Sequence, residues 1–193
     1  EPTPRPGLDE ELAAARDGAA LFDLTDCGVL HIAGDRAEAS LQQMLTSDVG
    51  ALEPGACQLA FMLDKDSRLI DDVCLFRLPP DEIGRDHYLL RTNPENHERV
   101  KAWVRAMSDG YTLFDPVDVF RKVEGPLVVD DLRLAEEEMC SVVLSLRGPK
   151  AGEVAGALDE IPGYRLQVAG GHLELIVAAG QAQAIYERLL EAG

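Results

Sequence analysis

The chain has 193 residues, 46% of them hydrophobic and 27% charged, and its 35 Asp and Glu against 18 Lys and Arg give a formal net charge of -17. This length suits one compact domain or two small ones, and the aliphatic content excludes disorder throughout. A chain this negative, with no basic stripe, is not expected to bind nucleic acid or an anionic membrane. No apolar run approaches the roughly 18 residues of a membrane span, and the start has no apolar signal core, so we expect a cytoplasmic protein.

The first half of the chain alternates helical and strand-like segments after a flexible leader over 1–7. Apolar residues at helical spacing predict helices, and short apolar runs bounded by turn residues predict strands. The polar turn 64–67 is typical of a β-hairpin, and Asn93 before Pro94 is predicted to cap the next helix. In chain order we predict a helix over 8–20, a strand over 28–33, a helix over 36–45, strands over 57–63, 69–78 and 87–92, and a helix over 95–107.

The second half begins with a less regular region. We predict one or two short strands over 111–123, interrupted at Pro116, and an irregular acidic connection over 124–140. The pattern then predicts a strand over 141–146, a helix over 149–158, strands over 166–169 and 172–178, and a helix over 181–191. We therefore divide the chain into an α/β domain over 8–123, the connection 124–140, and a second α/β subdomain over 141–193.

The cysteines and histidines do not have the spacings that are typical of a metal site or a redox cysteine pair. The four cysteines never form a Cys-x-x-Cys pair, and most of them lie in apolar strand-like runs, which is typical of buried thiols. The four histidines have none of the short spacings that zinc sites use. We therefore expect no metal site.

The most pointed polar feature is a pair of consecutive carboxylates, Asp71 and Asp72, in an otherwise apolar strand. Side chains alternate along a strand, so the two point to opposite faces and one of them can point inward. A buried carboxylate is costly unless it is hydrogen-bonded or paired, which makes such a position a site candidate. The alternative is that one caps the hairpin and the other is solvated. Asn93, at the end of the next strand, either caps a helix or offers a donor and an acceptor to a ligand.

Several segments, in order, resemble the glycine-cleavage T-protein (aminomethyltransferase) superfamily. Arg16-Asp-Gly-Ala-Ala-Leu-Phe-Asp-Leu-Thr25 is similar to its R-x-x-x-G-[LMV]-F-D-[VL]-[ST] segment, and Leu69-Ile-Asp-Asp72 to its I-D-D block. Tyr88-Leu-Leu-Arg-Thr-Asn93 resembles its strand that ends in asparagine, and Leu146-Arg-Gly-Pro-Lys-Ala151 its Q-G-P-x-A segment. The resemblance covers 14–108 well and 141–191 more loosely.

The resemblance implies an α+β, aminomethyltransferase-like folate-binding fold with mixed or antiparallel sheets, flanking helices and a central cavity for tetrahydrofolate. It places Asp72 at the pterin as both catalytic and binding residue, and Asn93 as a second pterin contact. A carboxylate there can hydrogen-bond the pterin and stabilise positive charge that develops during one-carbon transfer, without becoming a covalent nucleophile. The other binding positions of the family correspond to Leu59, Phe76 and Cys27.

The sequence also departs from the family pattern. Cys27 ends a segment where the family has S-H-M, and Leu59 replaces an expected tyrosine, while Phe76 keeps the aromatic character. The glycine-rich R-T-G-Y-T-G-E segment is replaced by a shorter connection over 164–171, so its glutamate has no counterpart. We also expect the C-terminal barrel to be absent. Because folate is anionic, local donors such as Asn93 or Arg91 would have to offset the negative charge of the chain.

Three functions remain open from the sequence. The first is a tetrahydrofolate-binding protein or subunit that acts in one-carbon metabolism with a partner protein. The second is an aminomethyltransferase-type transferase completed by another domain or chain. The third is an inactive structural or regulatory member of the fold.

Overall fold

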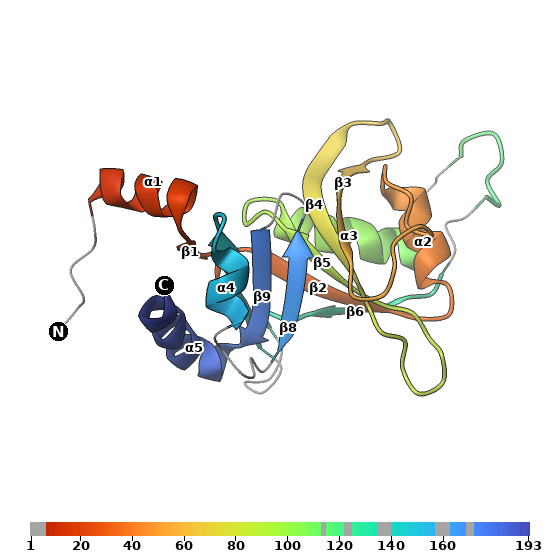
Figure 1. Cartoon of the computed structure of the whole chain (residues 1–193). Coiled ribbons are helices and arrows are strands. Elements are labelled where there is room, and N and C mark those ends of the chain that lie inside the picture. The colour runs from red at the N-terminus through yellow and green to blue at the C-terminus, as the bar shows by residue number, and fades with distance from the viewer. Residues whose placement is uncertain (1–6, 113–114, 122–124, 135–139, 157–162, 169–171) are drawn as a thin grey trace. The chain divides into compact units, whose positions relative to one another are not determined.

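The computed structural model describes residues 7–112, 115–121, 125–134, 140–156, 163–168 and 172–193 (Figure 1). The chain divides into two compact units. One consists of Glu1–Thr25 together with Glu137–Gly193, and the other is the continuous segment Asp26–Glu136.

The continuous unit is built on a five-stranded sheet in which every neighbouring pair is antiparallel, in the order β3-β4-β5-β2-β6. Two helices belong to this unit, α2 (Ala37–Met44) and α3 (His97–Ser108). The strands are β2 (Gly28–Ala33), β3 (Cys57–Leu63), β4 (Leu69–Leu78), β5 (His87–Thr92) and β6 (Val128–Asp131).

One face of this sheet forms the main hydrophobic core with α2 and α3. Alternate strand residues such as Leu30 and Ile32 of β2 point into it, as the period of a strand requires. The helices add residues at helical spacing, for example Val100, Val104 and Met107 of α3. Val73 of β4 belongs to this core, so its neighbour Asp72 points to the opposite face of the sheet.

The β3–β4 hairpin turns where the sequence predicts it. The carboxylate of Asp64 accepts hydrogen bonds from the backbone N–H groups of Asp66 and Arg68, each at 2.9 Å. Ser67 adopts φ 62°, a left-handed conformation that is uncommon outside glycine. The two backbone hydrogen bonds lower the pKa of Asp64, and the one from Arg68 has the larger effect.

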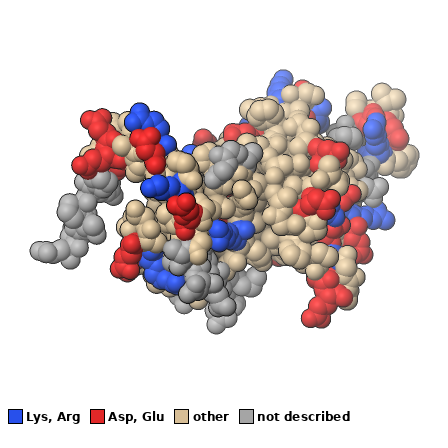
Figure 2. All heavy atoms as spheres, viewed as in Figure 1, with Lys and Arg blue, Asp and Glu red and all other residues tan. Residues whose placement is uncertain are grey.

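The discontinuous unit has a four-stranded antiparallel sheet in the order β1-β7-β9-β8. Residues of α4 and α5 form its core with one face of the sheet, whereas α1 has no buried residue. Acidic side chains gather on α1 (Figure 2). The elements are α1 (Leu8–Asp17), β1 (Ala20–Asp23), β7 (Ser141–Arg147), α4 (Ala151–Gly156), β8 (Tyr164–Val168), β9 (His172–Ala178) and α5 (Ala179–Ala192).

The structure confirms the predicted α+β class, with two antiparallel sheets, five helices and no closed barrel among the described residues. Several local predictions differ. Helix α3 begins at His97 with Asn96 as N-cap, so Asn93 is not its cap. The described residues of 111–123 contain no strand, and 113–114 and 122–124 lie outside the described residues. The connection 124–140 contains β6, and β1 pairs with β7, so the structure groups the first helix and strand with the C-terminal segment.

Candidate functional site

Strands β3 and β4 bring three predicted site residues onto one face of the five-stranded sheet. Residues directly opposite each other in an antiparallel ladder point to the same face. The ladder places Asp72 opposite Phe61, and Cys74 opposite Leu59. Phe76 lies on the face of Asp72 because it follows four residues later in the same strand. Asp72, Phe76 and Leu59 therefore share a face with Phe61.

Asn93, directly after β5, is hydrogen-bonded to both carboxylates of the pair. Its Nδ2 donates to Oδ1 of Asp71 and to Oδ1 of Asp72, each at 2.9 Å, and lies 3.2 Å from the carbonyl oxygen of Asp72. Its backbone N–H donates to Oδ2 of Asp71 at 2.9 Å. The structure thus brings together Asp72 and Asn93, the two residues that the sequence resemblance places at one ligand.

The two carboxylates differ in burial. Asp71 is 2% exposed and points inward, whereas Asp72 is exposed. A buried carboxylate needs hydrogen-bond donors, and Asp71 has three: two from Asn93 and one from Nδ2 of Asn96 at 2.8 Å. Asp71 is therefore a buried carboxylate that binds the two asparagines, and Asp72 is a carboxylate that faces outward.

The atoms that remain for a ligand are acceptors. Within the described residues, Oδ1 of Asn93 and Oδ2 of Asp72 receive no hydrogen bond, and neither belongs to the buried unpaired atoms. An amide oxygen accepts hydrogen bonds, and so does an ionised carboxylate. The site accordingly suits a ligand that carries N–H or O–H groups.

The other predicted positions lie in contrasting surroundings. Leu59 is 61% exposed, so its side chain is available at the surface of β3. Phe76 and Cys27 are buried, and Cys27 directly precedes β2. Contact of these three residues with a ligand stays a prediction.

Phe61 is a surface residue of this face that the sequence analysis did not single out. Its side chain is 54% exposed and lies directly opposite Asp72 in the ladder. The signal was present in the sequence: residues two apart in a strand share a face, so Phe61 follows Leu59 onto the same side. A large exposed aromatic residue beside a carboxylate is able to cover a planar ligand.

A buried polar network holds the turn that carries Asn93. Oγ1 of Thr92, the residue before it, is 2.8 Å from Nδ1 of His97, and Nε2 of His97 is 3.0 Å from Oδ2 of Asp131. His97 is fully buried. Nζ of Lys101 also donates to Oδ2 of Asp131, at 2.7 Å. The network ties the end of β5 and the start of α3 to β6, and so fixes both ends of the turn 93–96.

The charge of Asp131 depends on these donors. Burial raises the pKa of this carboxyl, but hydrogen bonds from Lys101 and His97 and from the backbone N–H of Arg133 outweigh burial and hold the pKa well below its usual range. Burial likewise opposes the charge of Lys101, yet its bonds to Asp131 and Glu98 raise its pKa. Asp131 and Lys101 are therefore an ionised pair near neutral pH.

Three residues of this network, His97, Glu98 and Asp131, also have the spacing of metal ligands. The ammonium group of Lys101 already lies among them, 2.7 Å from Asp131 and 2.8 Å from Oε2 of Glu98. Because an ammonium occupies the position that a cation would take, we assign no metal to these residues.

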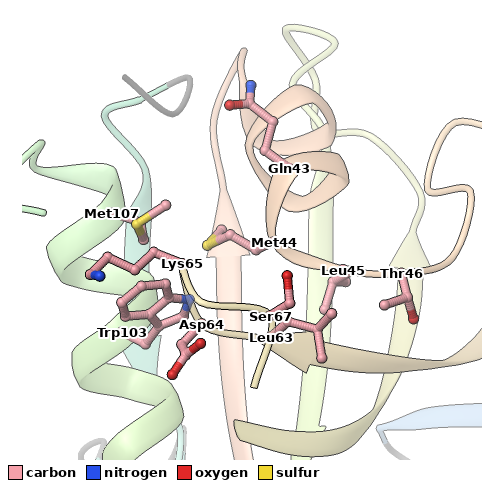
Figure 3. Close-up of a pocket in the computed structure, with 10 residues that line it drawn as sticks. All are labelled: Gln43, Met44, Leu45, Thr46, Leu63, Asp64, Lys65, Ser67, Trp103 and Met107. Carbon is pink, nitrogen blue, oxygen red and sulfur yellow. The ribbon is translucent and has the colours of Figure 1, made fainter. Parts of the chain in front are cut away.

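A separate cavity of about 230 Å³ lies between α2, the β3–β4 turn and α3 (Figure 3). The side chains of Met44, Met107 and Trp103 face the turn residues Asp64 and Lys65 there. None of the predicted site residues lines this cavity, so it is distinct from the Asp72 face.

Among the described helices, none is both long and apolar enough to cross a membrane.

Comparisons with known proteins agree on one family. Residues 2–163 match the family model described as the GCVT N-terminal domain. The aminomethyltransferase of Oceanobacillus iheyensis is 27% identical over 196 residues, which cover 96% of this chain and 51% of the relative. A probable aminomethyltransferase of Halobacterium salinarum is 38% identical over 78 residues, or 40% of this chain and 22% of the relative. The chain spans about half the length of the curated relatives it matches.

Two solved structures show the same fold. Glycine cleavage system aminomethyltransferase T from Bartonella henselae matches with a TM-score of 0.67 and 22% identity, over 94% of this chain and 48% of the other. A chain of the heterotetrameric sarcosine oxidase from Corynebacterium sp. U-96 matches with a TM-score of 0.50 and 13% identity, over 95% of this chain and 89% of the other.

Proposed function

The chain belongs to the GCVT N-terminal domain family, and we propose that it is a tetrahydrofolate-binding protein or subunit that acts in one-carbon metabolism. The observation that carries the proposal is the amide of Asn93, whose nitrogen is held between Asp71 and Asp72 while acceptor atoms remain for a ligand.

The chemistry of tetrahydrofolate fits these acceptors. A reduced pterin carries several N–H donors, on its amino group, its pyrimidinone nitrogen and its reduced ring nitrogens. Among the described residues, Oδ1 of Asn93 and Oδ2 of Asp72 are acceptors that receive no hydrogen bond, and the exposed Leu59 and Phe61 add apolar surface on the face of Asp72. When bound, the folate would supply the carrier nitrogens for a one-carbon unit.

Asp72 would contribute electrostatics as well as binding. An ionised carboxylate close to a nitrogen that gains positive charge lowers the energy of that charge, more so where a ligand excludes water. Arg91 lies opposite Cys74, on the same face of the sheet as Asp72, and adds a cation to this face. This arrangement would offset locally the net charge of -17.

A second candidate function is an aminomethyltransferase-type transferase completed by another domain or chain. Two observations favour it over an isolated enzyme. The chain spans about half the length of its aminomethyltransferase relatives, and it matches 89% of one chain of a heterotetrameric oxidase. A partner protein that supplies the parts of the relatives that this chain does not match is consistent with both.

Calorimetric titration under reducing conditions tests the proposed function. We expect tetrahydrofolate and 5-formyltetrahydrofolate to bind the wild-type chain, and D72N to weaken binding by about tenfold or more, because a charged acceptor is replaced by an amide. Asp66, an exposed carboxylate in the hairpin turn, offers the matched control D66N, which should bind as the wild type does.

Failure to detect heat or a thermal shift at millimolar folate would contradict binding and leave an inactive member of the fold. Equal affinity in D72N and D66N would show that binding does not use Asp72. Activity with an aminomethyl donor that requires a second chain would favour the second candidate.

A further inference from the structure

Asn93 and Asn96 are the only asparagines in the 193 residues, and both donate to the same carboxylate. That carboxylate, Asp71, is 2% exposed and points to the face of β4 opposite to that of Asp72. It therefore lies behind the proposed site. Asp71 is thus a buried acidic residue with no direct access to a ligand on the Asp72 face.

The hydrogen bonds of Asp71 define which way the Asn93 amide is turned. Oδ1 receives Nδ2 of Asn93 at 2.9 Å, while Oδ2 receives the backbone N–H of the same residue at 2.9 Å. The side chain and the backbone of Asn93 are thus gripped by the two oxygens of one carboxylate. Nδ2 of Asn96 shares Oδ1 at 2.8 Å.

The reverse orientation of the amide is excluded by its neighbours. If Oδ1 and Nδ2 of Asn93 exchanged places, the amide oxygen would face Oδ1 of Asp71, Oδ1 of Asp72 and the carbonyl oxygen of Asp72. All three are acceptors with no proton to donate, so every contact would become repulsive. The inward direction of the NH₂ group follows from this set of acceptors.

We propose that Asp71 is a positioning residue that fixes the polarity of the Asn93 amide, so that Oδ1 of Asn93 is presented as an acceptor, as Oδ2 of Asp72 is, and the site selects ligand groups that donate hydrogen bonds. The inference rests on the proposed function for its ligand. The N–H groups of a reduced pterin have this chemistry. An edge that offers acceptors would meet unpaired oxygens, which is unfavourable in a partly buried site.

Replacing Asp71 by asparagine would remove this constraint with little change of shape. An amide at position 71 is able to donate as well as accept, so the Asn93 oxygen could then turn inward and accept from it. A fraction of the molecules would present NH₂ in place of the acceptor. N96A is the matched control, because it removes the other partner of Asp71 and leaves the Asn93 contacts in place.

Asparagine-selective ¹⁵N labelling reads this orientation without any ligand, since the wild type gives only two side-chain NH₂ signals and D71N gives three. N93A, made in the wild type and in D71N, identifies the Asn93 pair in each by its disappearance. We expect that pair to exchange slowly with solvent in the wild type and in N96A, and to shift and exchange faster in D71N. An unchanged Asn93 pair in D71N would overturn the proposal. If D71N does not fold, the wild type decides: exchange as fast as that of an unstructured asparagine would overturn it as well.

Titration with tetrahydrofolate supplies the second readout. D71N should weaken binding by about tenfold, and N96A by less than about threefold. Equal weakening in both variants would reduce Asp71 to a structural tie and overturn the positioning role. If the wild type binds no tetrahydrofolate, the proposed function fails, whereas the NMR signals still decide whether Asp71 orients Asn93.

Discussion

A Cβ atom on Gly28 would lie 1.6 Å from Nδ1 of His97, so the imidazole ring occupies the space that a side chain at position 28 would need. The ring lies against the first residue of β2 and bridges Thr92 and Asp131 from there. Glycine at this position is therefore a requirement of packing, because its φ is not among the positive values.

We expect G28A to lower the free energy of unfolding by about 3 kcal/mol, since it displaces His97 and leaves buried polar groups unpaired. Urea unfolding measures the change. G152A is the control: a Cβ there meets nothing within 4 Å, and alanine favours a helix interior, so stability should be unchanged or slightly higher. Equal stability of G28A and the wild type would contradict the packing argument.

The ionised Asp131 predicts a loss of stability in acid. Its pKa is depressed in the folded chain, so its contribution is complete above the ordinary pKa of about 4 and is lost as the pH falls further toward the folded value. We expect D131N to cost about 3 kcal/mol at pH 7, and the difference from the wild type to shrink below about pH 4. Urea midpoints between pH 2 and 7 test this, and a difference that does not vary with pH would rule out the ionised pair.

Phe61 should matter for the ligand and little for the fold. Loss of an exposed aromatic surface in F61S is expected to weaken tetrahydrofolate binding by about fivefold to tenfold. I83S removes another large exposed side chain, 76% exposed, from the loop between β4 and β5 at the other end of β4 from Asp72, so it should leave binding unchanged. Titration of both variants compares them directly; a similar loss in each would argue against a role of the Asp72 face.

Ser67 offers a gain of stability. Its φ of 62° is strained for a residue with a Cβ, and glycine removes that strain at some cost in chain entropy. We expect S67G to raise the free energy of unfolding by about 0.5 kcal/mol. In D66G, one residue earlier and without a positive φ, only the entropy cost remains, and stability should fall. Thermal unfolding of the two variants should therefore shift in opposite directions.

Long apolar runs carried most of the fold prediction. The strands 28–33, 57–63, 69–78, 87–92 and 172–178 have the predicted bounds, because each has enough apolar residues between clear turn signals. The strands β1 and β6 have four residues each and were missed. Their partners, β7 and β2, are about a hundred residues away, and a short segment gains its strand conformation from such a partner more than from its own residues.

The site was predicted in part. Asp72 and Asn93 were named from a resemblance, and the structure joins them by a hydrogen bond. The helix-capping alternative for Asn93 was wrong because Asp71, from a different strand, offers its amide and its backbone N–H better partners. No pattern in the residues around Asn93 shows that it bonds to Asp71 and does not cap the helix. Likewise, the network around His97 depends on Asp131, which lies in a segment that looked irregular.

The pairing of β1 with β7 also orders events during synthesis. Residues Ala20–Asp23 are made long before Ser141–Arg147, so the β1–β7 pair cannot form until about three quarters of the chain has been made. The segment Asp26–Glu136, in contrast, contains every strand of its own sheet, so that sheet can be complete before Ser141–Arg147 are made. The sheet that carries Asp72, with Asn93 directly after β5, can therefore form during synthesis before β1 has a strand to pair with.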